Sequence, residues 1–133
     1  MDSKKYILYA DDDTDDREML EQAFENTPYV LLTFKNGQQL LDYMSQVKKE
    51  AVNLIVLDIN MPMVDGIMTL RTLRSDEALR DLPIILFTTS GSPMDRTSAE
   101  KLGARVIVKP VTYEQLKQVS QIMLSYCAGY KPS

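Results

Sequence analysis

Four apolar runs in this chain each end in side chains that could do chemistry. The groups that follow the runs are, in chain order, Asp11 with Asp12 and Asp13, then Asp58, then Thr88 with Thr89, and finally Lys109. If the runs are parallel strands, their carboxyl ends meet at one edge of a sheet, which is where open α/β sheets bind ligands. Carboxylates, hydroxyls and one ammonium group at such an edge suit a divalent cation and a phosphoryl group.

The acids in this set predict a bound cation. Several carboxylates within ~5 Å repel one another in a half-buried site, so either some are protonated or a cation is bound. The chain has no histidine, and its one cysteine, Cys127, lies near the C-terminus. Hard oxygen ligands alone favour Mg²⁺ (or Mn²⁺) over zinc. Residues 11–16 by themselves could equally be a helix start that suits the helix dipole, and the coincidence with Asp58 favours the cation.

Two other acidic motifs fail on residue spacing, and a third kind of phosphate site is disfavoured by charge. An EF-hand loop beginning at Asp11 needs Gly sixth and an acid twelfth, where the chain has Asp16 and Gln22. A haloacid-dehalogenase nucleophile motif needs Thr or Val where Asp15 stands. A flavodoxin-like phosphate site is disfavoured because the five Asp among residues 11–16 would repel the phosphate.

The elements that must position these groups follow from the apolar pattern. The expected strands cover residues 5–10, 29–34, 53–58, 84–88 and 105–109. Apolar side chains at helical spacing mark a helix over 14–26 and four more, at 40–47, 67–73, 99–102 and 116–123. Strict alternation predicts right-handed βαβ units, and therefore an α/β fold with a doubly wound, five-stranded parallel sheet and helices on both faces.

Polar and glycine residues mark the ends of the expected helices. Asp13 or Thr14 should cap the first helix, and Thr112 should cap the last. Gly103 stands where a helix C-cap glycine is expected, and Gly129 should end the last helix.

Length and charge limit the class of protein. The 133 residues predict a single domain, with a core over about 5–127. The formal net charge of −4 argues against a sequence-independent grip on nucleic acid or an anionic membrane, which needs a basic face. The chain shows no signal peptide and no apolar run near the ~18 residues of a membrane span. We therefore expect a cytoplasmic protein with no nucleic-acid or membrane partner, and the lone cysteine fits a reducing compartment.

The segment 58–66, Asp-Ile-Asn-Met-Pro-Met-Val-Asp-Gly, is the most specific string in the chain. Together with the acids after the first strand, the Thr88-Thr89 pair and Val-Lys-Pro at 108–110, it resembles the receiver domain of two-component response regulators. The matching motifs extend over residues 6–124. The resemblance implies a flavodoxin-like fold with strand order 2-1-3-4-5, and a stand-alone regulator of the chemotaxis or relay type.

The resemblance also assigns an acceptor and a metal site. Asp58 would be the phosphoacceptor, a carboxylate nucleophile that forms an acyl phosphate. Asp12 would bind Mg²⁺ directly and Asp11 through water. Asp58 and the backbone oxygen of Asn60 would complete the protein ligands.

Other residues would act on the phosphoryl group. Lys109 would neutralise its charge, and Thr88 would hydrogen-bond its oxygens after transfer. The backbone N–H of Thr89 could add a donor. In this family the bond corresponding to Lys109–Pro110 is usually cis, which would aim the lysine inward.

Several neighbouring residues have simpler interpretations. Asp13 is better explained as a helix N-cap than as a ligand, and Asp65 as a turn residue than as a catalytic group. Ser90 could equally contact the phosphoryl group or cap a turn. Met61 and Met63 flank the acceptor and could shield it, although the methionines are mostly expected to fill the core.

The resemblance implies partners in trans. The donor would be a phosphohistidine on a histidine kinase or a histidine phosphotransfer protein, because this chain has no histidine of its own. If residues 1–133 are the whole protein, the output also passes to another protein, through the face formed by residues 94–126, and the regulator is a monomer or a phosphorylation-dependent dimer. It would not be an enzyme beyond its own phosphorylation and dephosphorylation. The alternatives are a pseudo-receiver that only binds protein and, further off, a Mg²⁺-dependent phosphohydrolase of small molecules.

One position departs from the family pattern. The family usually has Tyr or Phe three residues before the lysine, and its ring swings inward when the threonine moves. Here that position is Val106. A valine cannot exchange exposed and buried positions as a ring does, so we expect activation to rely on movement of the loop 88–93.

Overall fold

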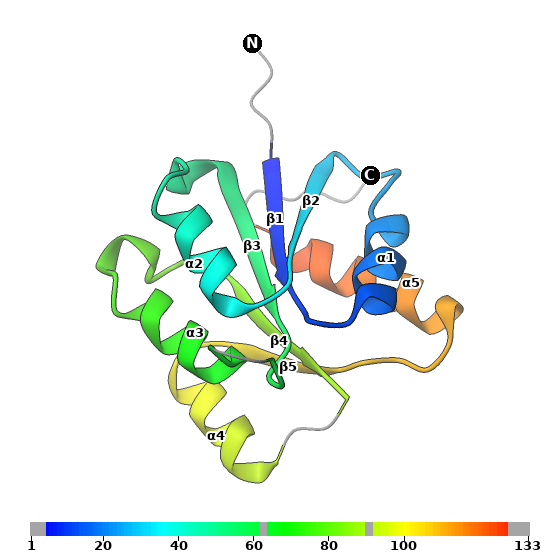
Figure 1. Cartoon of the computed structure of the whole chain (residues 1–133). Helices are drawn as coiled ribbons and strands as arrows, with labels where there is room; N and C mark the ends of the chain where they lie inside the picture. The colour runs from blue at the N-terminus through cyan, green and yellow to red at the C-terminus, as the bar shows by residue number, and fades with distance from the viewer. Residues whose placement is uncertain (1–4, 62–63, 90–91, 128–133) are drawn as a thin grey trace.

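A five-stranded parallel sheet forms the centre of the molecule (Figure 1). This computed structural model describes residues 5–61, 64–89 and 92–127. The sheet has the order β2-β1-β3-β4-β5, which confirms the expected order 2-1-3-4-5. The strands are β1 (Lys5–Ala10), β2 (Tyr29–Phe34), β3 (Val52–Leu57), β4 (Ile84–Thr88) and β5 (Arg105–Val108).

Helices cover both faces of the sheet, as expected for a doubly wound fold. They are α1 (Thr14–Ala23), α2 (Gly37–Met44), α3 (Gly66–Arg74), α4 (Pro93–Lys101) and α5 (Tyr113–Tyr126). The helices α1 and α5 lie together on one face, and α2, α3 and α4 lie on the other (Figure 1). None of these helices is long and apolar enough to cross a membrane.

The apolar core is divided in two by the sheet. Successive side chains of a strand point to opposite faces, so Leu8 and Ala10 of β1 pack on the side of α2, α3 and α4. Ile7 and Tyr9 pack on the side of α1 and α5. Both faces are covered, which explains why the central strands read as continuous apolar runs and not as alternating ones.

The ends of several elements differ from the sequence-based expectation. α1 ends at Ala23 and not at residue 26, because the backbone N–H of Phe24 still bonds into the helix while its own conformation leaves it. α2 ends at Met44 with Ser45 as its cap, so Val47 lies beyond the helix. Two short 3₁₀ helices, η1 (Lys49–Ala51) and η2 (Glu77–Leu79), were not expected.

The expected caps are largely confirmed. The Asp13 carboxylate, and not the Thr14 hydroxyl, caps α1 by accepting from a backbone N–H at 3.0 Å. The hydroxyl of Thr112 does the same for α5 at 3.1 Å. Gly103 follows α4 with a φ of 73°, a left-handed conformation that favours glycine. The expected helix end at Gly129 lies outside the described residues.

One arginine joins two connections on the α3 side of the sheet. The guanidinium of Arg74, at the end of α3, donates 2.7 Å bonds to the carbonyls of Leu82, before β4, and Leu102, after α4. Further bonds reach the carbonyls of Leu79 at 2.9 Å and Gly103 at 3.3 Å. Burial lowers the pKa of this guanidinium, with Asp81 opposing the effect. Because Arg has five donors in a fixed fork, a single side chain satisfies carbonyls from separate loops.

We predict that Arg74→Met destabilises the fold by about 2–3 kcal/mol, because carbonyls that bonded a charged donor lose their partner. Urea unfolding followed by circular dichroism measures the loss. Arg71→Met, on the exposed side of the same helix, is the matched control and should change stability by less than about 0.5 kcal/mol. Equal stability of the two variants would contradict this role of Arg74.

Candidate functional site

The register of the sheet brings the expected site residues to one edge. Ala10 at the end of β1 pairs with Leu57 at the end of β3. The two acids that follow, Asp11 and Asp58, therefore leave the sheet side by side. Lys109 follows the end of β5 in the same way, and its backbone N–H donates to the last carbonyl of β4 at 2.8 Å.

The ammonium group of Lys109 is the centre of this cluster. Its Nζ lies 2.6 Å from Oδ2 of Asp11, 2.7 Å from Oδ2 of Asp16 and 3.4 Å from Oδ2 of Asp58. The lysine side chain is only 9% exposed. The carboxylates come from three different elements, so one cation ties the ends of β1 and β3 to the first turn of α1.

Asp11 is fully buried and is held by several donors. Besides Lys109, the hydroxyl of Tyr9 donates to its Oδ2, and the backbone N–H of Asp13 donates to its Oδ1 at 2.9 Å. Burial, and then the charge of Asp11, raise the pKa of the Tyr9 hydroxyl well above its ordinary value, so the phenol remains a donor. Arg17 donates to the backbone carbonyl of Asp11 at 2.7 Å, which fixes the peptide as well.

Asp58 is buried and has fewer partners than Asp11 within the described part of the chain. Apart from the distant Lys109, its Oδ1 accepts from the backbone N–H of Asn60 at 3.3 Å. Burial raises the pKa of the Asp58 carboxyl to about 6; Lys109 opposes this rise and Asp11 adds to it. Burial alone would lower the pKa of the Lys109 ammonium group, but its bonds to Asp11 and Asp16 outweigh burial and raise it. Among the described residues, the Asp58 carboxylate therefore accepts fewer and longer hydrogen bonds than that of Asp11.

Three carboxylates at this edge could hold a metal ion. Asp11, Asp12 and Asp58 each offer an oxygen, and these oxygens lie within 4.8 Å of one another. Asp12 is exposed and therefore accessible to an ion from solvent, whereas the other two are buried. An all-oxygen donor set fits Mg²⁺ or Mn²⁺.

The loop after β3 is shaped by a close backbone approach. Gly66 begins α3, and its N–H donates to the carbonyl of Ile59 at 3.0 Å. A Cβ atom at position 66 would overlap the carbonyl oxygen of Asp58 and lie 2.8 Å from Cα of Ile59. The carboxylate of Asp65 caps α3 by accepting from the N–H of Met68 at 2.8 Å, which agrees with the expected turn role. Only glycine fits at position 66, because any Cβ atom there would meet the backbone of Asp58 and Ile59.

The remaining expected site residues lie around the same edge. Thr88 is the buried last residue of β4, and Thr89 is exposed directly after it. The Lys109–Pro110 bond is trans, which differs from the cis bond that is usual in the family. The lysine reaches the acids directly from the end of β5. The expected roles of Met63 and Ser90 concern residues outside the described part of the chain.

Two contacts of the cluster were missed in the sequence. Tyr9 precedes Asp11 by two positions, so the two share a face of the sheet, a period-two signal that could have paired them. Asp16 was taken only as one acid of a helix start. Nothing in the sequence separates it from Asp15 until the direction of α1 relative to Lys109 is known.

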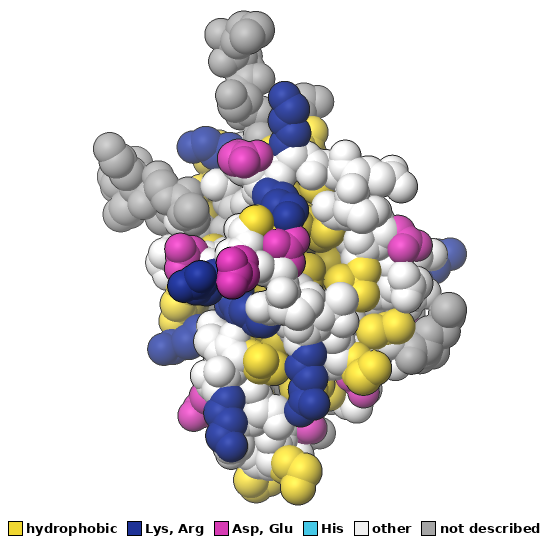
Figure 2. Space-filling model, turned by 90° about the vertical axis from the view of Figure 1, so that its left-hand side faces the viewer, with side chains coloured by type: hydrophobic (Ala, Val, Ile, Leu, Met, Phe, Trp, Pro, Cys, Tyr) yellow, Lys and Arg dark blue, Asp and Glu magenta, His cyan; other side chains and the backbone are white. Residues whose placement is uncertain are grey.

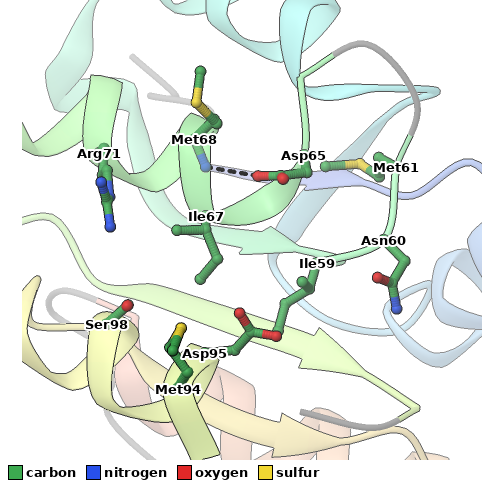
Figure 3. Close-up of a pocket in the computed structure, with 10 residues that line it drawn as sticks. All are labelled: Ile59, Asn60, Met61, Asp65, Ile67, Met68, Arg71, Met94, Asp95 and Ser98. Atoms are coloured by element: carbon green, nitrogen blue, oxygen red, sulfur yellow. Dashed lines mark hydrogen bonds between the residues drawn. The ribbon is translucent and has the colours of Figure 1, made fainter. Parts of the chain in front are cut away.

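A groove opens next to this edge between α3 and α4 (Figure 3). It has a volume of about 640 Å³. Asn60 lines it at one end, and Met68, Met94 and Arg71 line it further along. Asp58 and Lys109 do not line it. On this side of the molecule Lys and Arg side chains are interspersed with Asp and Glu (Figure 2).

The chain matches the family model of the response regulator receiver domain over residues 7–121, and it belongs to this family. A curated relative, "Probable transcriptional regulator ycf27" of Guillardia theta, is 31% identical over 118 residues, which are 88% of this chain and 44% of that protein. The chain thus spans less than half the length of the curated relatives it matches.

Solved structures agree with the fold. The phosphorylated cyanobacterial phytochrome response regulator RcpA is 25% identical and superimposes with a TM-score of 0.84 over 97% of each chain. The Mn(2+)-bound form of the response regulator Rcp1 is 22% identical, with a TM-score of 0.81 over 97% of this chain and 99% of that one.

We predict that Gly66→Ala displaces the backbone of the loop after β3 and destabilises the fold by about 1–3 kcal/mol, because the added methyl group has no space. The amide resonances of Asp58 and Asn60 should shift in a ¹H–¹⁵N spectrum. In the control Gly103→Ala, the added carbon would have nothing closer than 3.8 Å. Its strain arises only from φ, and its shifts should stay near α4. Unshifted Asp58 and Asn60 amides in Gly66→Ala would argue against the contact.

Proposed function

We propose that this chain is a phosphoacceptor that takes a phosphoryl group onto Asp58 from a phosphohistidine of a histidine kinase or histidine phosphotransfer protein. The observation that carries the proposal is the buried Asp58 carboxylate, 3.4 Å from the Lys109 ammonium and grouped with Asp11 and Asp12. Membership of the receiver family supports it. Among similar proteins, RcpA has been solved in a phosphorylated form.

The chemistry is a phosphoryl transfer between two side chains. An oxygen of the Asp58 carboxylate attacks phosphorus, and the P–O bond forms as the P–N bond to the donor imidazole breaks. The electron pair of that bond stays on the imidazole nitrogen, which takes up a proton. Lys109 offers its ammonium to the negative charge on the phosphoryl oxygens, where fixed charges stabilise the transition state. Hydrolysis of the acyl phosphate by water resets the site.

The acids would hold the metal ion that such a transfer uses. Asp12 and Asp58 would bind Mg²⁺ or Mn²⁺ directly, Asp11 would do so through water, and the backbone oxygen of Asn60 would complete the protein ligands. When bound, the ion neutralises charge on the transferring group. The fit rests on the three carboxylate oxygens within 4.8 Å of one another and on the absence of histidine from the chain.

The signal would leave along β4. Thr88, buried at the end of β4, would hydrogen-bond the phosphoryl group, and the N–H of Thr89 would add a donor. The exposed apolar side chains Met94 and Ile122 belong to the 94–126 face that we propose as the output surface. We further propose that residues 1–133 act as a single receiver domain.

The first test is labelling with a small phosphodonor. With Mg²⁺ and acetyl phosphate, we expect one hydroxylamine-sensitive phosphoryl group on Asp58, mapped by mass spectrometry. It should be lost in Asp58→Asn and after removal of Mg²⁺ with EDTA, because both the nucleophile and the charge-neutralising ion are needed. Label at another residue, or none even from a phosphohistidine donor protein, would leave the pseudo-receiver as the better description.

A second test addresses the metal site. Asp12→Asn should weaken Mg²⁺ binding roughly tenfold or more, since it removes a full charge next to a divalent ion. Asp15→Asn is the matched control: it removes the same charge from an exposed acid outside the three-carboxylate group, and binding should change little. Titration calorimetry measures both. Equal losses in the two variants would mean that only net charge matters.

A third test concerns the switch. Val106 is half-buried and packs against the core beneath α3 and α4, so no ring is available at this position to move inward. Addition of Mg²⁺ and beryllofluoride, a phosphoryl mimic, should shift amide resonances between Thr88 and Val106 through loop movement. A ¹H–¹⁵N comparison with the free protein shows this. Shifts confined to the first turn of α1 would contradict a route through β4.

A further inference from the structure

The ammonium group of Lys109 lies between the carboxylates of Asp16 and Asp58, which belong to different parts of the fold. Its Nζ bonds Asp16 of α1 at 2.7 Å, whereas Asp58, the proposed acceptor after β3, is 3.4 Å away. The third carboxylate, Asp11, is bonded at 2.6 Å. An ammonium group has three donors, and in this arrangement its two short bonds go to acids other than the acceptor.

Asp16 is held in place by the start of α1. Its backbone N–H donates to the capping carboxylate of Asp13 at 3.0 Å, and Arg17 next to it bonds the carbonyl of Asp11 at 2.7 Å. The side chain is 35% exposed, so it reaches Lys109 from the solvent side of the cluster. Asp16 is not one of the acids grouped for a metal ion among the described residues.

We propose that Asp16 is a positioning residue that holds Lys109 against α1 and releases it when a phosphoryl group occupies Asp58. This inference rests on the proposed function, and it adds to that function a residue that sets how readily Lys109 reaches the phosphoryl group.

The order of release follows from burial. The bond from Lys109 to Asp11 has no exposed side-chain surface on the acid, and breaking it would leave a buried charge, which is strongly unfavourable. Water can solvate the carboxylate of Asp16 once the lysine leaves, because that carboxylate is partly exposed. A phosphoryl group with about −1.5 to −2 charges attracts the ammonium more strongly than one carboxylate does. Asp16 is therefore the partner that is exchanged.

A cavity borders both Lys109 and Asp16, so that water can solvate Asp16 when the ammonium group leaves it. A cavity of about 170 Å³ lies between α1 and α5, lined by Asp16, Lys109, Phe87 and Pro110 among others. The ring of Phe87 has its centroid 5.9 Å from Nζ, so the ammonium keeps a favourable aromatic contact on one side. Release of Asp16 would also free the first turn of α1 from the edge of the sheet, which couples α1 to the state of the site.

The test compares three variants of the full chain by beryllofluoride binding in Mg²⁺, measured with ¹⁹F NMR. Asp16→Asn should lower the half-saturating concentration by about two- to fivefold, because the mimic no longer competes for Lys109. Asp16→Glu, which keeps the charge, should return it to the wild-type value. The matched control Asp15→Asn removes an equal charge from the neighbouring exposed position and should leave binding within about 1.5-fold.

A second measurement follows Lys109 directly. The ¹⁵N resonance of its ammonium group should move in Asp16→Asn, stay in Asp15→Asn, and move in the wild type when beryllofluoride binds. Binding in Asp16→Asn that is equal to, or weaker than, that in Asp15→Asn overturns the inference, and so does an unmoved ammonium resonance. If the wild type binds beryllofluoride and is labelled on Asp58 by acetyl phosphate, such a result rejects the inference alone. A wild type that does neither rejects the proposed function, and this inference with it.

Discussion

The ammonium group of Lys109, placed among carboxylates at the edge of a buried sheet, is the interaction on which the site depends. Like charges in a poorly solvated place repel, and here a single cation from β5 offsets the charges of Asp11, Asp16 and Asp58. The single positive charge of Lys109 does not neutralise the site, because three carboxylates face one ammonium group. Burial raises the pKa of Asp58 and the charge of Asp11 adds to this rise, while the residual negative charge is what the proposed cation site would use.

The rest of the fold places these groups within ångströms of one another. Register is decisive: a slip of one residue between β1 and β3 would turn Asp11 or Asp58 to the other face of the sheet. The helices on the two sides of the sheet stabilise that register, because they bury both faces of the central strands. Gly66 allows the following helix to begin against the backbone of Asp58, and Arg74 fixes the connections around β4 from the far side of α3.

The sequence was sufficient for the architecture because apolar runs and helical spacings alternate without interruption, and that alternation has few solutions. Asp11, Asp12, Asp58 and Lys109 could be grouped in advance because each follows a strand. Asp16 could not be grouped with them, because its contact depends on which side of α1 faces Lys109. Successive residues of a helix point about 100° apart, so a shift of one residue changes that side. The end of α2 before Val47 was mispredicted for a related reason, because local helical preference does not determine how the following segment packs.

A valine at position 106 leaves the question of how β4 and the lysine could move together. The backbone supplies a link, because the N–H of Lys109 donates to the carbonyl of Thr88 at 2.8 Å. A pull on Thr88 by a phosphoryl group and a shift of the Lys109 side chain toward the same group therefore act on one hydrogen-bonded pair of residues. That pair joins the acceptor edge to β5, and Asp16 joins the same lysine to α1. Phosphorylation would then act on two sides of the molecule through one side chain, without needing an aromatic ring to carry the change.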